Sequence, residues 1–211
     1  MADAAQRQRK LAAKLARRKA VVAEKRKVGV LPTGLAGRIR VASKGRVIHC
    51  VMPSGLFEIG IGHIIVARAL PSGQLGCAWF LVDVFCLGVK DVFYAEMSER
   101  ELLSRLAGQD GLQSFVDAEP SRARKLIRDA AAYAADLGLA AARDTPVIEA
   151  IFGDIDVTAC TETFDFGKDG KPFFMSGPRD TPARINLVNR TLQSRCGNGG
   201  WNYMVEVHPG L

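Results

Sequence analysis

The sequence contains few of the residues and motifs by which enzymes are usually identified. Only three histidines occur in 211 residues, and no two cysteines are closer than nine residues, so no spacing typical of a zinc site is present. The chain has no P-loop, no G-x-G-x-x-G after a strand, no G-x-S-x-G and no H-E-x-x-H. These absences exclude the common nucleotide-binding, serine-hydrolase and zinc-protease signatures, and the sequence predicts no cofactor.

Long apolar runs are also missing. The most apolar stretch, residues 60–94, is interrupted by His63, Arg68, a Pro-Ser-Gly turn and Asp83, so it does not predict a membrane helix. The first residues lack the apolar centre of a signal peptide. They are rich in Arg and Ala, as mitochondrial transit peptides are, but they contain Asp3 and no serine. We therefore expect a cytoplasmic protein with no membrane partner.

The five cysteines are odd in number and scattered along the chain. Most of them lie in apolar segments, which predicts buried, reduced thiols. Cys86, within the sequence FCLG, is the candidate for a reactive thiol.

Acidic residues are nearly absent from the start of the chain. Residues 1–46 contain 14 Lys and Arg residues against Asp3 and Glu24, a balance of +12, whereas residues 47–211 contain 15 basic and 20 acidic residues, a balance of −5. An imbalance of this size predicts an acidic partner, most commonly nucleic acid. The residues expected to contact its phosphates are Arg7, Arg9, Lys10, Lys14, Arg17, Arg18, Lys19, Lys25, Arg26, Lys27, Arg38 and Arg40.

Residues 1–29 are predicted to form a basic N-terminal arm. A helix from Gln6 to Lys27 would be about 33 Å long, and the segment is rich in good helix formers, so the arm is either helical or a disordered solubilising tail. A membrane-surface helix is less favoured, because the apolar face has no Trp or Phe. Residues 30–45 are predicted to be a connector, and residues 46–211 a single α+β globular domain.

The centre of the predicted fold is a buried β-hairpin at about residues 62–85. With a two-residue Ser-Gly loop, Gly62 opposes Asp83 and Arg68 opposes Cys77, all on one face of the hairpin. Both faces are mainly apolar, so we expect other elements to cover both. The predicted fold class is α+β, with a mixed or antiparallel sheet built on this hairpin and packed with three to four helices.

The second half of the chain predicts helices and strands of ordinary polarity. Apolar residues at helical spacing, or nearby capping residues, predict helices at residues 98–108, 111–120, 121–137, 144–153 and 181–195. A second hairpin is expected within residues 154–176, around a Gly-Lys-Asp-Gly turn. A last strand, within residues 201–209, is expected to join the sheet.

Asp83 is a carboxylate in an apolar strand and therefore needs a partner. One interpretation makes it a metal ligand or general base close to Asp91, and the other makes it a structural cap of the following turn. The catalytic candidates are Asp83, Asp91 and Lys90, and magnesium is expected only under the catalytic interpretation. Asp154 and Asp156 are expected to be exposed strand residues, with a metal site as the alternative.

Thr181 and Pro182 predict a helix start whose free amides favour an anion. We therefore predict a phosphate site at Arg179, Thr181 and Arg184, with a plain capped helix as the alternative. The four basic residues in the first half of the helix at 121–137 predict either a surface that needs positive charge or solvated side chains.

Three functions from different classes follow from these patterns. The first is non-catalytic nucleic-acid binding, with RNA slightly preferred because no motif for reading duplex DNA is visible; the arm contacts phosphates and the body recognises shape or a partner. The second is a metal-dependent nuclease that uses Asp83 and Asp91. The third is a subunit of a larger protein or ribonucleoprotein assembly whose arm docks on an acidic protein.

Overall fold

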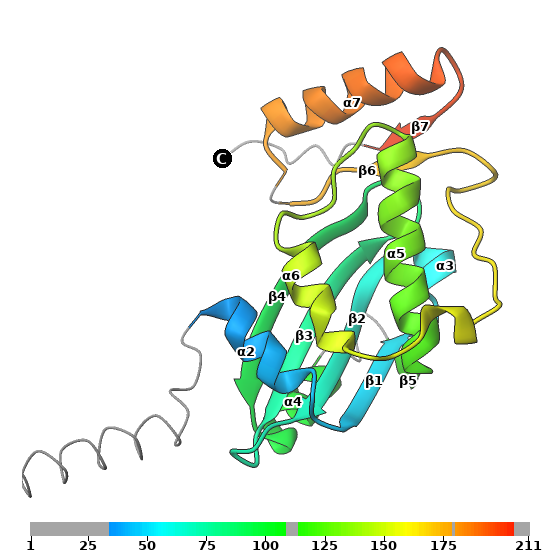
Figure 1. Ribbon diagram of the computed structural model, residues 1–211. Coiled ribbons are helices and arrows are strands. Elements are labelled where there is room, and N and C mark those ends of the chain that lie inside the picture. Colours follow the sequence, from blue (N-terminus) through cyan, green and yellow to red (C-terminus); the bar gives the residue numbers. More distant parts are fainter. Residues whose placement is uncertain (1–33, 109–113, 179, 205–211) are drawn as a thin grey trace, which may run out of the picture. The chain divides into compact units, whose positions relative to one another are not determined.

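The computed structural model describes residues 34–108, 114–178 and 180–204. This part of the chain contains a five-stranded antiparallel sheet and six α-helices, which confirms the predicted α+β class (Figure 1). The chain divides into two compact units, residues 1–38 and 39–211. The predicted arm, residues 1–29, lies outside the described residues.

The elements follow one another from a helix at the start to a short strand at the end. The helices are α2 (Leu35–Ala42), α3 (Leu56–Ile59), α4 (Glu99–Ala107), α5 (Pro120–Asp136), α6 (Thr145–Glu149) and α7 (Pro182–Cys196), with 3-10 turns η1 (Ala150–Phe152) and η2 (Val157–Ala159). The strands are β1 (Val47–Pro53), β2 (Ile61–Ala69), β3 (Leu75–Asp83), β4 (Gly88–Met97), β5 (Phe115–Asp117), β6 (Phe173–Met175) and β7 (Asn202–Met204). None of these helices is long and apolar enough to cross a membrane.

The sheet has the strand order β4-β3-β2-β1-β5, so the predicted hairpin of β2 and β3 lies at its centre. The predicted register of this hairpin is wrong by one residue, because Ile61 and not Gly62 pairs with Asp83. The strands are joined by residues 70–74 and not by a two-residue loop. A shift of one residue moves side chains to the opposite face. Arg68 and Asp83 therefore lie on opposite faces of the sheet.

Both faces of the central hairpin are covered, as predicted. On the face that carries Trp79, the side chains of Leu102 and Leu106 from α4 complete a buried cluster. On the other face Phe80 meets Phe152 of η1, with ring centroids 6.0 Å apart. Figure 1 shows α5 and α6 crossing this second face, with α4 behind the sheet. The sheet is thus the middle layer of three.

Helices α4, α5 and α7 form where apolar spacing and capping residues predicted them. Ser98 and Thr181 are the N-caps of α4 and α7, and the side-chain oxygen of each accepts a hydrogen bond from a backbone amide three residues later. Pro120 is in the first turn of α5, where its missing N–H costs no helical hydrogen bond. A proline in the first turn of a helix and side-chain caps thus make these helix starts predictable.

Several predicted elements are wrong. The helix predicted at residues 111–120 is absent from the described residues 114–119, because β5 pairs there with β1. The second hairpin forms only at its turn, where Lys168 and Lys171 make an isolated antiparallel bridge, and the two predicted strands do not pair. Strand β7 does not join the main sheet but pairs with β6 in a separate parallel sheet. Helix α2 occupies part of the predicted connector, and β4, a full edge strand, was not predicted.

Side-chain contacts with helices, rather than strand pairing, fix the segment between η1 and β6. Phe164 stacks on Phe57 of α3 with ring centroids 6.0 Å apart, and Phe166 stacks on Tyr133 of α5 at 5.1 Å. Glu162 forms an ion pair with Arg122 of α5. Its acidic residues Asp154, Asp156, Glu162 and Asp165 are exposed, as predicted, but none of them lies in a strand.

The basic residues in the first half of α5 all have acidic partners. Arg124 and Arg128 both pair with Glu149 of α6, at 2.6 and 2.9 Å between nitrogen and oxygen. Arg122 pairs with Glu162, and Lys125 pairs with Asp129 one turn later. Three of these charges connect α5 to α6 and to the segment after η1, and all four are paired with carboxylates, although the side chain of Arg128 is still 47% exposed.

Replacing Glu149 with Gln is expected to destabilise the fold by about 1–3 kcal/mol, because Arg124 and Arg128 lose their shared carboxylate. Burial alone raises the pKa of Glu149, but hydrogen bonds from the two arginines outweigh it and lower the pKa below 4.5. The stabilising contribution is therefore complete above pH 4.5 and is lost as the pH falls through the lowered pKa.

Urea unfolding at pH 7 and at pH 3.5 measures this effect. The matched control is Glu101→Gln, which removes an exposed ion pair with Arg105 and is expected to change stability by no more than about 0.5 kcal/mol. Equal unfolding midpoints for the two variants at pH 7 would contradict the role given to Glu149.

Candidate anion site around Arg68

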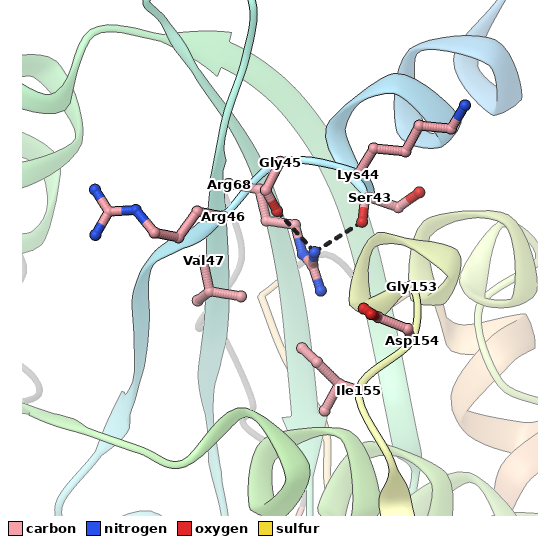
Figure 2. A pocket seen from close by; sticks show the side chains of 9 residues that line it. All are labelled: Ser43, Lys44, Gly45, Arg46, Val47, Arg68, Gly153, Asp154 and Ile155. Carbon is pink, nitrogen blue, oxygen red and sulfur yellow. Dashed lines mark hydrogen bonds between the residues drawn. The ribbon is translucent and has the colours of Figure 1, made fainter.

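A hollow of about 740 Å³ lies where the turn after α2, the start of β1, strand β2 and the end of η1 meet. Figure 2 shows the side chains around it, with the guanidinium of Arg68 at the centre. The lining residues are Ser43, Lys44, Gly45, Arg46, Val47, Arg68, Gly153, Asp154 and Ile155. Three of them are basic and one is acidic, so the lining carries net positive charge.

Arg68 is 4% exposed, and main-chain carbonyls hold its guanidinium. Nη1 donates to the carbonyl oxygens of Ser43 at 2.7 Å and Gly45 at 2.8 Å, and Nη2 donates to that of Phe152. Nε is buried and has no hydrogen-bond partner among the described residues. Because carbonyls are neutral, they accept hydrogen bonds from Nη1 and Nη2 without forming an ion pair, and the nearby negative charge that acts on the guanidinium is that of Asp154.

Two glycines allow these carbonyls to come so close to Arg68. A Cβ on Gly45 would lie 1.9 Å from the carbonyl oxygen of Ala69, a distance that no side chain tolerates. Gly153 has φ +59°, and a Cβ there would lie 2.7 Å from the carbonyl oxygen of Ser43. The tight turns on both sides of the guanidinium therefore depend on the absence of side chains.

Around the hollow, Lys44 and Arg46 are exposed, and so is Arg40 in the last turn of α2. Their side chains form no ion pair within the described residues, unlike the basic residues of α5. In Figure 2 the side chains of Lys44 and Arg46 extend away from Arg68, whereas Asp154 lies beside the guanidinium. Burial lowers the pKa of Arg68 below its usual value, and the negative charge of Asp154 acts in the opposite direction. The net positive charge of the lining allows the hollow to bind an anion.

Asp83 caps the turn after β3, as the structural interpretation predicted. Its Oδ1 accepts hydrogen bonds from the backbone amides of Phe85 at 3.0 Å and Cys86 at 2.9 Å. The side chain is almost fully buried, and burial raises its pKa to about 6, although these amides and Lys90 lower it. Asp83 also faces Ile61 and not the open space beside a glycine.

The other two catalytic candidates have separate partners. Asp91 is exposed, and its Oδ1 accepts a hydrogen bond from the amide of Val92. Lys90 Nζ lies 2.9 Å from Asp180 Oδ2. Within residues 34–108, 114–178 and 180–204, no group of three or more His, Cys, Asp or Glu side chains has a geometry that suits a metal ion. Nothing in this geometry supports the metal-dependent interpretation.

The predicted phosphate site at the start of α7 contains an acidic residue of the chain itself. Asp180 accepts a hydrogen bond from the amide of Gly177 at 2.7 Å and pairs with Arg184 at 3.1 Å. Thr181 caps the helix by accepting a hydrogen bond from the amide of Arg184. Arg179 and the candidate phosphate contacts from Arg7 to Lys27 lie outside the described residues, whereas Arg38 and Arg40 lie on α2.

Three of the five cysteines are buried, namely Cys50, Cys77 and Cys86, and all five are free thiols. Burial, followed by the charge of Asp83, raises the pKa of Cys86, so this residue lacks the thiolate character of a reactive cysteine. The prediction of buried, reduced thiols is confirmed for these three.

Comparison with known proteins gives no relative from which a function can be transferred. No protein-family model, no curated protein and no solved structure matches the chain. The function is therefore argued from the residues of the chain and their geometry.

Replacing Arg68 with Met is expected to destabilise the protein by about 3 kcal/mol, because one buried and two partly buried carbonyls lose their donors. Arg46→Met removes an exposed arginine from the same hollow and is expected to change stability by about 0.5 kcal/mol at most. Urea unfolding of the two variants at pH 7 makes the comparison. A small effect at Arg68 would show that water replaces its contacts.

Asp83→Asn keeps an oxygen that accepts from Phe85 and Cys86, so we expect this variant to be at least as stable as the natural chain at pH 7. Asp83→Ala loses both bonds and is expected to cost about 1–3 kcal/mol. Because burial raises the pKa of Asp83 to about 6, its protonated form stabilises the fold fully below pH 3.8, and this contribution is lost as the pH rises through 6.

Any stability advantage of Asp83→Asn at pH 7 should therefore disappear by about pH 4. Urea unfolding of the three proteins at both pH values measures it. A strongly destabilised Asn variant at pH 7 would show that the fold requires the negative charge of Asp83.

Proposed function

We propose that the protein binds nucleic acid, with RNA preferred, through contacts between its basic residues and phosphates, without catalysing a reaction. The balance of +12 in residues 1–46 supports this, because phosphate contacts dominate the affinity of nucleic-acid-binding proteins. We also propose that it acts in the cytoplasm. A preference for RNA follows from the absence of a motif that reads duplex DNA, and it rests on the sequence alone.

The observation that carries the proposal is that one set of basic residues has carboxylate partners and another set has none. Those of α5 are neutralised by carboxylates, whereas Arg40, Lys44 and Arg46 are exposed and have no ion pair in the described part of the chain. All three belong to the basic segment 1–46, and Lys44 and Arg46 line the hollow at Arg68. Two exposed basic residues without a described ion pair, Lys44 and Arg46, thus lie beside the buried guanidinium of Arg68.

A phosphodiester suits this hollow better than a neutral ligand. The buried guanidinium provides a fixed positive charge in a region of low dielectric constant, where charge interactions are stronger than in water. Lys44 and Arg46 have long side chains that can turn toward a bound phosphate, and their rotation costs little while they are unpaired. The hollow of about 740 Å³ is larger than one phosphate, as expected for a segment of a chain.

The metal-dependent nuclease hypothesis has no support from the contacts of its candidate residues. Asp83 is buried and accepts two backbone hydrogen bonds, and Lys90 pairs with Asp180. A site that activates water requires convergent oxygen ligands with at least one open position. The third hypothesis, docking of the arm on an acidic protein, is tested by the same charge variants.

Removing the charges of Lys44 and Arg46 together is expected to weaken binding to single-stranded RNA and to flatten its salt dependence. At about 0.7 per phosphate contact, the slope of log K against log salt should become less negative by roughly 1.4. Fluorescence anisotropy of a labelled single-stranded RNA between 50 and 300 mM salt measures the slope for Lys44→Gln/Arg46→Gln and for a chain that starts at Val28.

Arg100→Gln/Arg143→Gln is the matched control, because it removes the same charge from two exposed residues of other elements. The slope of this control is expected to stay close to that of the full chain. Deletion of the arm should lower the affinity most, because ten of the predicted phosphate contacts lie before Val28. Equal slopes for all four proteins would refute the proposal, and binding to acidic polypeptides but not to RNA would favour the third hypothesis.

A further inference from the structure

A groove of about 470 Å³ lies between α7 and the end of the described chain, distant in sequence from the Arg68 hollow. It is lined by Asn189, Arg190, Gln193, Ser194, Trp201 and Tyr203. Four of these residues come from α7, Trp201 precedes β7, and Tyr203 lies within it. The lining combines aromatic rings, amides and one arginine, and it contains no acidic residue.

The two aromatic residues have different roles in this groove. Trp201 packs against the buried cluster that contains Val188 and Leu192, and its Nε1 donates to Gln193 Oε1 at 3.3 Å, so the indole is fixed. Tyr203 is 59% exposed, and its ring centroid lies 5.3 Å from that of Trp201. A fixed Trp thus supports a Tyr ring that faces solvent, which is the arrangement of a stacking platform.

The polar side of the groove has unused hydrogen-bonding capacity. Asn189 Oδ1 is buried and has no partner within residues 34–108, 114–178 and 180–204. Arg190 is exposed, and its Nε donates only to a carbonyl of its own helix. Helix α7 contains three arginines and no Asp or Glu, and of the three only Arg184 has a described carboxylate partner. An amide and an arginine without a counterion therefore lie next to an exposed aromatic ring.

We propose that this groove binds a nucleobase of single-stranded RNA, stacked on Tyr203, with Arg190 close to the adjoining phosphate. The inference rests on the proposed function and adds the chemistry by which bases are held. Amides suit the hydrogen-bonding edges of bases, and arginine suits phosphate. A neutral oligosaccharide would also stack on the ring but does not require an uncompensated arginine, and an acidic peptide does not require the ring.

Binding of a short oligouridylate of about eight nucleotides to the full chain tests the inference. Tyr203→Leu removes the platform and is expected to weaken this binding by about tenfold, whereas Tyr203→Phe keeps the ring and should bind within about twofold of the natural chain. Leu187→Ala is the matched control, because Leu187 is as exposed on α7 as Tyr203 is on β7 and does not line the groove.

An abasic ribose-phosphate oligomer of the same length separates base stacking from phosphate contact. Its affinity is expected to be the same for Tyr203→Leu and the natural chain, and the salt slope for oligouridylate should also be unchanged by this substitution. Circular dichroism confirms that each variant is folded. Tyr203 is exposed, so its substitution is not expected to affect the core.

The outcomes distinguish the inference from the function on which it rests. If the natural chain binds oligouridylate and Tyr203→Leu binds it equally well, the groove is not a base site and the proposed function stands. If the natural chain binds no RNA at low salt, both are refuted. Binding of a neutral oligosaccharide that depends on Tyr203 would overturn the assignment of the groove to a nucleobase.

Discussion

The burial of both faces of the β2–β3 hairpin is the constraint from which most of the other features follow. A strand that is covered on both sides has no solvent for its polar side chains, so each must be satisfied by the protein. Arg68 and Asp83 lie on opposite faces and cannot neutralise each other. Backbone groups bind each of them instead: two amides donate to Asp83, and three carbonyls accept from Nη1 and Nη2 of Arg68.

Burial has different electrostatic consequences for the two side chains. Protonation can remove the charge of Asp83, and burial has already raised its pKa to about 6. Arginine keeps its proton even when burial lowers its pKa, so Arg68 remains a cation at physiological pH. The carbonyls around it accept hydrogen bonds from Nη1 and Nη2 without supplying negative charge. The fold therefore places a permanent positive charge at the base of a hollow, and this property makes Arg68 a candidate for anion recognition.

The sequence predicted elements that depend on local patterns and missed those that depend on distant partners. The apolar runs of β2 and β3 and the caps Ser98 and Thr181 are local, and the elements they indicate are present. The predicted register of the hairpin is wrong because residues 70–74, and not the expected two-residue loop, join β2 to β3. Strand β6 pairs with β7, which lies far along the chain, and no local pattern specifies such a parallel pair. The site at Arg68 was missed for the same reason, since carbonyl partners leave no signature in the sequence.

The sequence also does not show which charged residues have distant partners. The proposed function therefore has to be tested at individual residues. In the sequence the arginines of α5 look as basic as those of residues 38–46, and only the fold shows that Glu149 and Glu162 neutralise the former. Residues 47–211 carry a balance of −5, so the body as a whole does not attract a polyanion. If it contacts RNA, the contact has to be local, at a few uncompensated cations. Long-range attraction then comes from the basic segment, whereas position and base preference come from individual side chains of the body.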